Sequence, residues 1–124
     1  MTIRRLSVLQ WLGLVGGAGV WFASFVGGVG VSQAVCNPGG KRWGVPFDAV
    51  EIALAAVAVA LLVAAELASV VVFRATRDVG EEDPPPPGRL HFFASAALLA
   101  NLLFLLIVVL STVATVVNRT CHQA

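Results

Sequence analysis

The stretch VPFDAVEIALAAVAVALLVAAELASVVVF, residues 45–73, decides the fold. Between Glu51 and Arg74 its only ionisable side chain is Glu66. A run of about 20 apolar residues is what an α-helix needs to cross a hydrocarbon layer of about 30 Å. Pro46 suits the first helical turn, and Glu51 lies near the helix N-terminus, where the helix dipole favours an acid. The stretch therefore predicts a membrane-spanning helix.

Small side chains recur at every fourth residue in this stretch and in the apolar run that precedes it. Small residues at this spacing allow two helices to approach closely within a bilayer. We predict helix-packing faces formed by Ala56, Ala60, Ala64 and Ala68 in the central stretch and by Gly19, Ala23 and Gly27 in the first run.

The composition is that of a membrane protein. Of the 124 residues, 58% are hydrophobic and 12% are charged, whereas soluble domains carry about 25% charged residues. A net charge of +1 gives no reason to expect a nucleic-acid partner. The glycine clusters of the first run lack the strand-then-helix context of a phosphate-binding loop. We expect no enzymatic activity, cofactor, metal or small-molecule substrate.

Two further apolar runs flank the central one. A signal peptide is the alternative interpretation of the first run, but its length of about 26 residues exceeds the usual core of about 7–15. The connector at residues 75–89 contains four consecutive prolines, which predict an extended linker. The sequence thus predicts a single all-α domain, residues 1–124, that is embedded in the lipid bilayer. Its three transmembrane helices are expected at about residues 6–33, 46–74 and 90–117.

The positions of the basic residues predict the orientation. Short cytoplasmic loops of membrane proteins carry an excess of Lys and Arg. One side of the predicted bundle collects Arg4, Arg5, Arg74, Arg77 and Arg89, and the other collects Lys41, Arg42 and Arg119. We therefore expect a cytoplasmic N-terminus, a cytoplasmic linker at residues 75–89 and an external C-terminus.

The two cysteines each follow a predicted helix. Three crossings would place Cys36 and Cys121 on the same, external side, where disulfides persist. We expect a disulfide between them, with two free thiols as the first alternative. A metal site formed by both cysteines and His122 is the weaker alternative, because the spacing does not match that of known zinc sites.

An ionisable residue within a membrane crossing is a candidate functional site, because burying its charge is costly. Antiparallel helices would place Glu66 and Asn101 at similar depth, and Gly16 and Gly17 of the first run would leave space beside them. An amide can hydrogen-bond either form of a carboxyl group. Two interpretations remain open for Glu66: a neutral carboxyl group held by Asn101 that locks the bundle, or a carboxyl group that carries protons or contacts a partner.

The chain resembles a family of small three-helix bacterial membrane proteins whose genes accompany those of haem-copper cytochrome c oxidases. The resemblance rests on residues 17–21 (GAGVW), Cys36, Arg89, Phe92, residues 97–109 (ALLANLLFLLIVV) and Cys121. It implies a multi-pass protein of the bacterial cytoplasmic (inner) membrane, with the subunits of a larger oxidase complex as partners. The expected function is that of a non-catalytic accessory or assembly subunit. A small oligomeric transporter or proton-conducting protein that uses Glu66 is the alternative.

Overall fold

The computed structural model describes residues 1–36, 44–118 and 121. It consists of three helices, α1 (Ile3–Cys36), α2 (Phe47–Ala75) and α3 (Pro87–Val117), with no strand among the described residues. Each helix is long and apolar enough to cross a membrane. The predicted three-helix membrane fold is therefore confirmed, with α1 three residues longer at each end than expected and α3 beginning three residues earlier.

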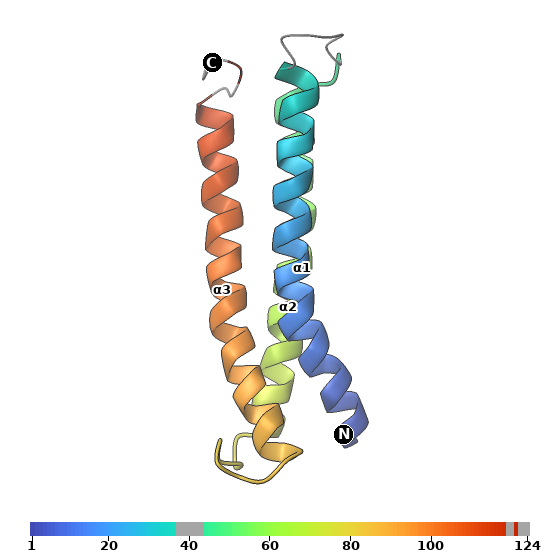
Figure 1. Cartoon of the computed structure of the whole chain (residues 1–124), viewed down its shortest axis with the longest axis vertical. Helices are drawn as coiled ribbons and strands as arrows, with labels where there is room; N and C mark the ends of the chain where they lie inside the picture. Colours follow the sequence, from blue (N-terminus) through green and yellow to red (C-terminus); the bar gives the residue numbers. More distant parts are fainter. Residues whose placement is uncertain (37–43, 119–120, 122–124) are drawn as a thin grey trace.

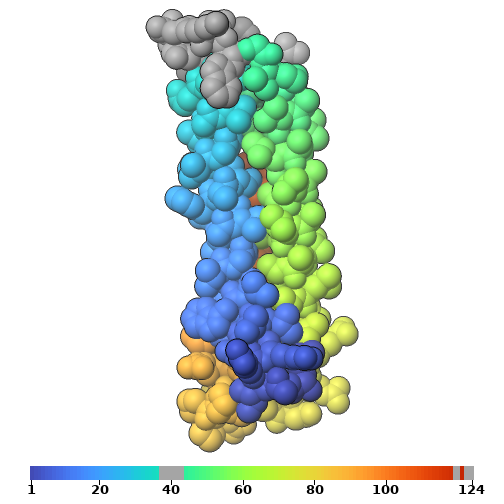
Figure 2. Space-filling view, turned by 90° about the vertical axis from the view of Figure 1, so that its right-hand side faces the viewer, coloured from blue at the N-terminus to red at the C-terminus, as the bar shows by residue number. Residues whose placement is uncertain are grey.

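The helices run up, down and up, and each contacts the other two (Figure 1). One end of the bundle contains Cys36 and Cys121 and is called the disulfide end below; the opposite end contains the connection between α2 and α3 and is called the linker end. The first residues of α1 lie at the linker end. Figure 2 shows α1 and α2 packed side by side along the bundle, with α3 behind them.

A narrow seam of buried residues runs along the bundle axis. On α1 and α2 these residues are spaced alternately three and four apart. On α3 the same spacing holds from Leu90 to Asn101 and is followed by a step of seven to Val108. This is the heptad spacing of left-handed helix packing. The seam consists of Leu6, Gln10, Gly13 and Gly17 on α1, Ala58, Leu62, Ala65, Ser69 and Val72 on α2, and Leu90, Ala94, Ala97, Asn101 and Val108 on α3. Glu51 precedes Ala58 by one heptad and is also buried.

Large apolar side chains cover the outside of the bundle. Leu99 is 70% exposed and Phe22 is 60% exposed, and both belong to a much larger set of outward-facing Leu, Val, Ile and Phe residues. A soluble protein of this size rarely exposes such a continuous apolar surface. The surface is suited to contact with lipid, in agreement with the length and composition of the helices.

The small residues that were predicted to form helix-packing faces point away from the seam. Gly19, Ala23, Ala56, Ala60 and Ala64 are exposed, and only Gly27 and Ala68 are half-buried. The prediction of helix-packing faces is therefore wrong for these five residues where contacts between helices of this chain are concerned. Residues four apart on a helix drift by about 40° per step. A strict four-residue row therefore turns away from a seam that repeats on average every 3.5 residues.

The connection between α2 and α3 is compact rather than extended. The backbone N–H of Val79 donates to the Thr76 carbonyl at 3.0 Å, and the N–H of Asp83 donates to the Gly80 carbonyl at 3.1 Å. The Asp83 carboxylate also accepts a 2.8 Å hydrogen bond from the N–H of Gly80. The prediction of an extended linker is wrong, because turn formation by Gly80 and Asp83 folds the segment before the prolines are reached. The helix α3 then begins at Pro87, where a missing N–H is tolerated.

Candidate functional site

A polar centre lies where the three helices meet, within the linker-end half of the bundle. The Asn101 side chain is 2% exposed, and its Nδ2 donates a 3.1 Å hydrogen bond to the Gly13 carbonyl oxygen. The same Nδ2 lies 3.5 Å from Ser69 Oγ, which itself donates to the Ala65 carbonyl at 3.0 Å. One amide on α3 therefore ties α1 and α2 together.

Two glycines of α1 make room for this centre. A Cβ atom at Gly17 would overlap the Asn101 side chain, and a Cβ atom at Gly13 would overlap the Ser69 hydroxyl. The prediction that Gly17 leaves space beside Asn101 is thus confirmed. It is wrong for Gly16, because a Cβ atom there would meet no described atom within 4 Å.

Glu66 lies beside Asn101, but none of the hydrogen bonds described above joins the two side chains. Both residues line a cavity of about 90 Å³, whose other walls are Leu and Val side chains. Glu66 Oε2 and Asn101 Oδ1 are buried and have no hydrogen-bond partner among the described residues. The structure therefore brings the predicted pair into one cavity, and the two roles considered for Glu66 both stay predictions.

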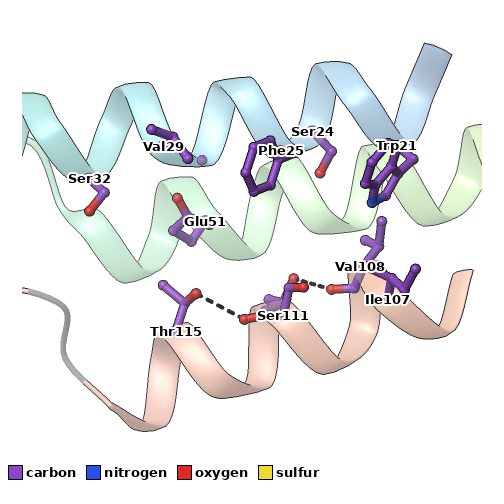
Figure 3. Close-up of a pocket in the computed structure, with 12 residues that line it drawn as sticks. Trp21, Ser24, Phe25, Val29, Ser32, Glu51, Ile107, Val108, Ser111 and Thr115 are labelled. Atoms are coloured by element: carbon purple, nitrogen blue, oxygen red, sulfur yellow. Dashed lines mark hydrogen bonds between the residues drawn. The ribbon is translucent and has the colours of Figure 1, made fainter. Parts of the chain in front are cut away.

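A second polar centre, which we call the Glu51 cavity, occupies the disulfide-end half of the bundle (Figure 3). Its volume is about 220 Å³, and it is partly open to the outside between the helices. Glu51 enters from α2, Trp21, Ser24, Phe25, Gly28, Val29 and Ser32 come from α1, and Ile107, Val108, Ser111, Thr112 and Thr115 come from α3. Glu51 is 8% exposed, and its Oε1 is buried with no hydrogen-bond partner in the described part of the chain.

The hydroxyl groups of α3 present acceptor atoms to this cavity. Thr112 Oγ1 donates its proton to the Val108 carbonyl at 2.8 Å, and Thr115 Oγ1 donates to the Ser111 carbonyl at 2.9 Å. A hydroxyl group has one proton and two lone pairs. Because each proton is used within the helix, the lone pairs of both oxygens remain available to a donor in the cavity.

An apolar layer separates the two polar centres. Ala58, Leu62 and Val108 are buried together, with Trp21 and Phe104 packed against them. The two aromatic rings are stacked with their centroids 5.3 Å apart. No continuous row of polar side chains therefore connects Glu66 to Glu51 among the described residues.

Glu51 and Gln10 are buried polar groups that were not predicted from the sequence. Gln10 is 1% exposed, and neither of its amide atoms has a hydrogen-bond partner among residues 1–36, 44–118 and 121. Gln10 interrupts an apolar run, which was a usable signal. For Glu51 the signal was the row of Ser24, Gly28 and Ser32, which repeats every four residues and lines the wall opposite α3.

The cysteines lie at disulfide distance, as predicted. The structure joins Cys36 and Cys121 with their Cα atoms 5.3 Å apart, although 85 positions separate them in the sequence. The bond ties the end of α1 to the segment that follows α3. No three His, Cys, Asp or Glu side chains gather into a metal-binding group in the described part of the chain, and His122 lies outside that part.

Together, these features define the chain as a multi-pass α-helical membrane protein with two separate polar centres. Comparison with protein-family models, with curated proteins and with solved structures finds no match to this chain. Its function therefore has to be argued from the bundle itself.

Proposed function

We propose that this chain is a non-catalytic accessory or assembly subunit of a larger membrane complex. The observation that carries the proposal is the outward direction of the small-residue rows. Ala56, Ala60 and Ala64 on α2 are exposed and are not used in the packing of this chain. Small residues on a helix surface allow close approach of another helix in lipid. These residues thus leave room for the helices of another subunit.

The respiratory terminal oxidase (cytochrome c oxidase) is the specific complex we propose, in the bacterial cytoplasmic (inner) membrane. Support for this choice comes from the resemblance of residues 17–21 and 97–109 to oxidase-associated proteins. The positions of Trp21 and Asn101 at the two polar centres are compatible with a structural role for both segments. An accessory subunit needs no catalytic group of its own.

Affinity purification in a mild detergent tests this function. We expect the tagged protein to co-purify with oxidase subunits, and we expect Ala60→Leu to reduce their recovery several-fold. Because Ala60 is exposed, the variant should melt within a few degrees of the unmodified protein, which is the control for folding. Recovery of the unmodified protein without oxidase subunits would contradict the proposed complex.

A proton-conducting or transport function using Glu66 is the second candidate. The buried Oε2 of Glu66 favours it, because this atom has no hydrogen-bond partner in the part of the chain that the structure describes. The apolar layer of Ala58, Leu62 and Val108 argues against it, because a proton path needs a chain of polar groups or water. Proton flux into liposomes that contain this protein alone, lost in Glu66→Gln, would support this second function over the first.

The proposed orientation places the N-terminus and the linker end in the cytoplasm. A Glu82→Cys variant should then react with a membrane-impermeant maleimide only after spheroplasts are permeabilised, since Glu82 is exposed in the linker. Gly44→Cys, at an exposed position near the disulfide end, is the matched control and should react in intact spheroplasts. The reverse labelling pattern would invert the orientation.

A further inference from the structure

The carboxyl group of Glu51 has no compensating charge among the described residues. The one ion pair in that part of the chain joins Arg77 to Asp78, which follow the far end of α2 from Glu51. A buried charge is costly unless it is paired and hydrogen-bonded. Glu51 is more than nine-tenths buried and faces a cavity large enough for a ligand, so a group that enters the cavity can supply the partner that the described residues do not.

The cavity walls favour a cationic donor as that partner. One side carries the Glu51 carboxyl group, and the opposite side carries the Thr115 side chain (Figure 3). Thr112 lines the same cavity, and the protons of both threonine hydroxyl groups are used within α3. Trp21 and Phe25 of α1 add an aromatic wall, with their ring centroids 6.3 Å apart. Aromatic faces attract organic cations. Acceptors, one carboxyl group and aromatic rings therefore converge on the same space.

We propose that the Glu51 cavity binds a primary ammonium group of an organic molecule. Such a group has three N–H donors, which the carboxylate and the threonine oxygens can accept, and a carbon chain that can pack against Trp21 and Phe25. A divalent metal ion fits less well, because Ca²⁺ requires six to eight oxygen ligands and Glu51 is the only carboxylate among the described residues that line the cavity. A volume of about 220 Å³ also exceeds the needs of a single bare ion.

The depth of Glu51 allows two sources for the ammonium group. The 29 residues of α2 span about 43 Å at 1.5 Å per residue, which exceeds a hydrocarbon layer of about 30 Å. Glu51 is the fifth residue of this helix, about 6 Å from its start, and therefore lies at the depth of lipid headgroups. The ligand is either the headgroup of a phosphatidylethanolamine lipid or a small soluble amine that enters from the aqueous side.

Native mass spectrometry tests the lipid source. The full-length protein is equilibrated in micelles with equimolar phosphatidylethanolamine and phosphatidylcholine, whose quaternary ammonium has no N–H donor. We expect retained phosphatidylethanolamine to exceed phosphatidylcholine about tenfold, because phosphatidylcholine cannot form the charge-assisted hydrogen bond to Glu51. We expect Glu51→Gln to abolish this preference. Glu66→Gln, the same change elsewhere on α2, is the matched control and should retain it.

Fluorescence of Trp21 tests the soluble source. In a Trp11→Phe, Trp43→Phe background within phosphatidylcholine nanodiscs, ethanolamine hydrochloride should produce a saturable change that Glu51→Gln removes. A preference for phosphatidylethanolamine without a fluorescence change on addition of ethanolamine identifies the lipid headgroup as the ligand. A saturable fluorescence change without a lipid preference identifies a soluble amine. If Glu51→Gln fails to fold, Thr115→Val serves instead, since it removes one acceptor with little change in shape, and should weaken binding several-fold.

Three results would overturn the proposal. The first is that neither probe binds, and the second is that binding is unchanged in both Glu51→Gln and Thr115→Val. The third concerns Lys41, Arg42 and Arg119, which lie outside the described residues. If an ammonium preference appears only after all three are replaced with Gln, a basic side chain of this chain is the native partner of Glu51.

Discussion

The Gly17→Ala variant is expected to be less stable than the unmodified protein by about 2 kcal/mol, as is typical of overpacking a filled core. The added Cβ atom would overlap the Asn101 side chain. Asn101 cannot move aside freely, because its Nδ2 donates to the Gly13 carbonyl and lies against Ser69. The substitution therefore disturbs the point that joins all three helices.

Gly16→Ala is the matched control for this prediction. Gly16 is adjacent in sequence, but a Cβ atom there meets no described atom within 4 Å. Alanine is also a better helix former than glycine by about 1 kcal/mol, so this variant should be as stable as the unmodified protein or slightly more stable. Thermal unfolding followed by circular dichroism in detergent measures both variants. Equal melting temperatures for Gly17→Ala and Gly16→Ala would show that the close contact with Asn101 is not formed.

The double variant Gly17→Ala, Asn101→Ala separates crowding from other effects of the new methyl group. Removing the Asn101 amide creates the space that the alanine needs, so the two changes should not be additive. Residues in direct contact show interaction energies of about 0.5–3 kcal/mol in such cycles. We expect the double variant to be no less stable than Asn101→Ala alone.

The helices themselves could be predicted from the sequence because their signal is strong. Three long apolar runs, separated by glycine, proline and charged residues, allow few alternatives in a chain of 124 residues. The same runs place Cys36 and Cys121 at one end of the bundle. The structure brings them to disulfide distance there. The depth of Asn101 relative to Glu66 followed from counting residues along antiparallel helices, and both residues line one cavity.

The faces of the helices were harder to predict. In a soluble helix the polar residues mark the outside, but here leucine and valine occur both in the seam and on the lipid-facing surface. The central stretch has alanines on several faces, so a four-residue row of Ala56, Ala60 and Ala64 was as visible as the true row. The heptad spacing from Glu51 through Ala58, Leu62 and Ala65 was present in the sequence. Only the structure shows that this row is the buried one.

The role of Glu51 was misjudged for a related reason. An acid in the first turns of a helix is explained by the helix dipole alone, so nothing in the sequence required a further role for Glu51. Glu51 lies against Gly28 of α1, where a Cβ atom would be in ordinary contact with Glu51 Oε1 at 3.4 Å. Ser111 and Thr115 of α3 line the same cavity. Such a convergence of three helices cannot be deduced from any one of them.

Removal of the disulfide should lower stability by about 2–4 kcal/mol, the typical range for a native cross-link. The bond between Cys36 and Cys121 closes a loop with a sequence separation of 85. For a fully flexible chain this would give about 4 kcal/mol or more. Helices persist in a membrane-embedded unfolded state, so fewer residues gain freedom when the bond is broken. We therefore expect the double variant Cys36→Ser, Cys121→Ser to fall in the lower half of the range.

Thermal unfolding with and without reductant measures this effect. Reductant should lower the melting temperature of the unmodified protein to that of the double serine variant, and it should leave the variant itself unchanged. Intact-mass measurement after alkylation provides the chemical control, with no label before reduction and a label on both cysteines after it. Labelling of both cysteines in unreduced protein would show that the bond is absent. In that case α1 and α3 are held together at the disulfide end by packing alone, without a covalent tie between the two helices that line the Glu51 cavity together with α2.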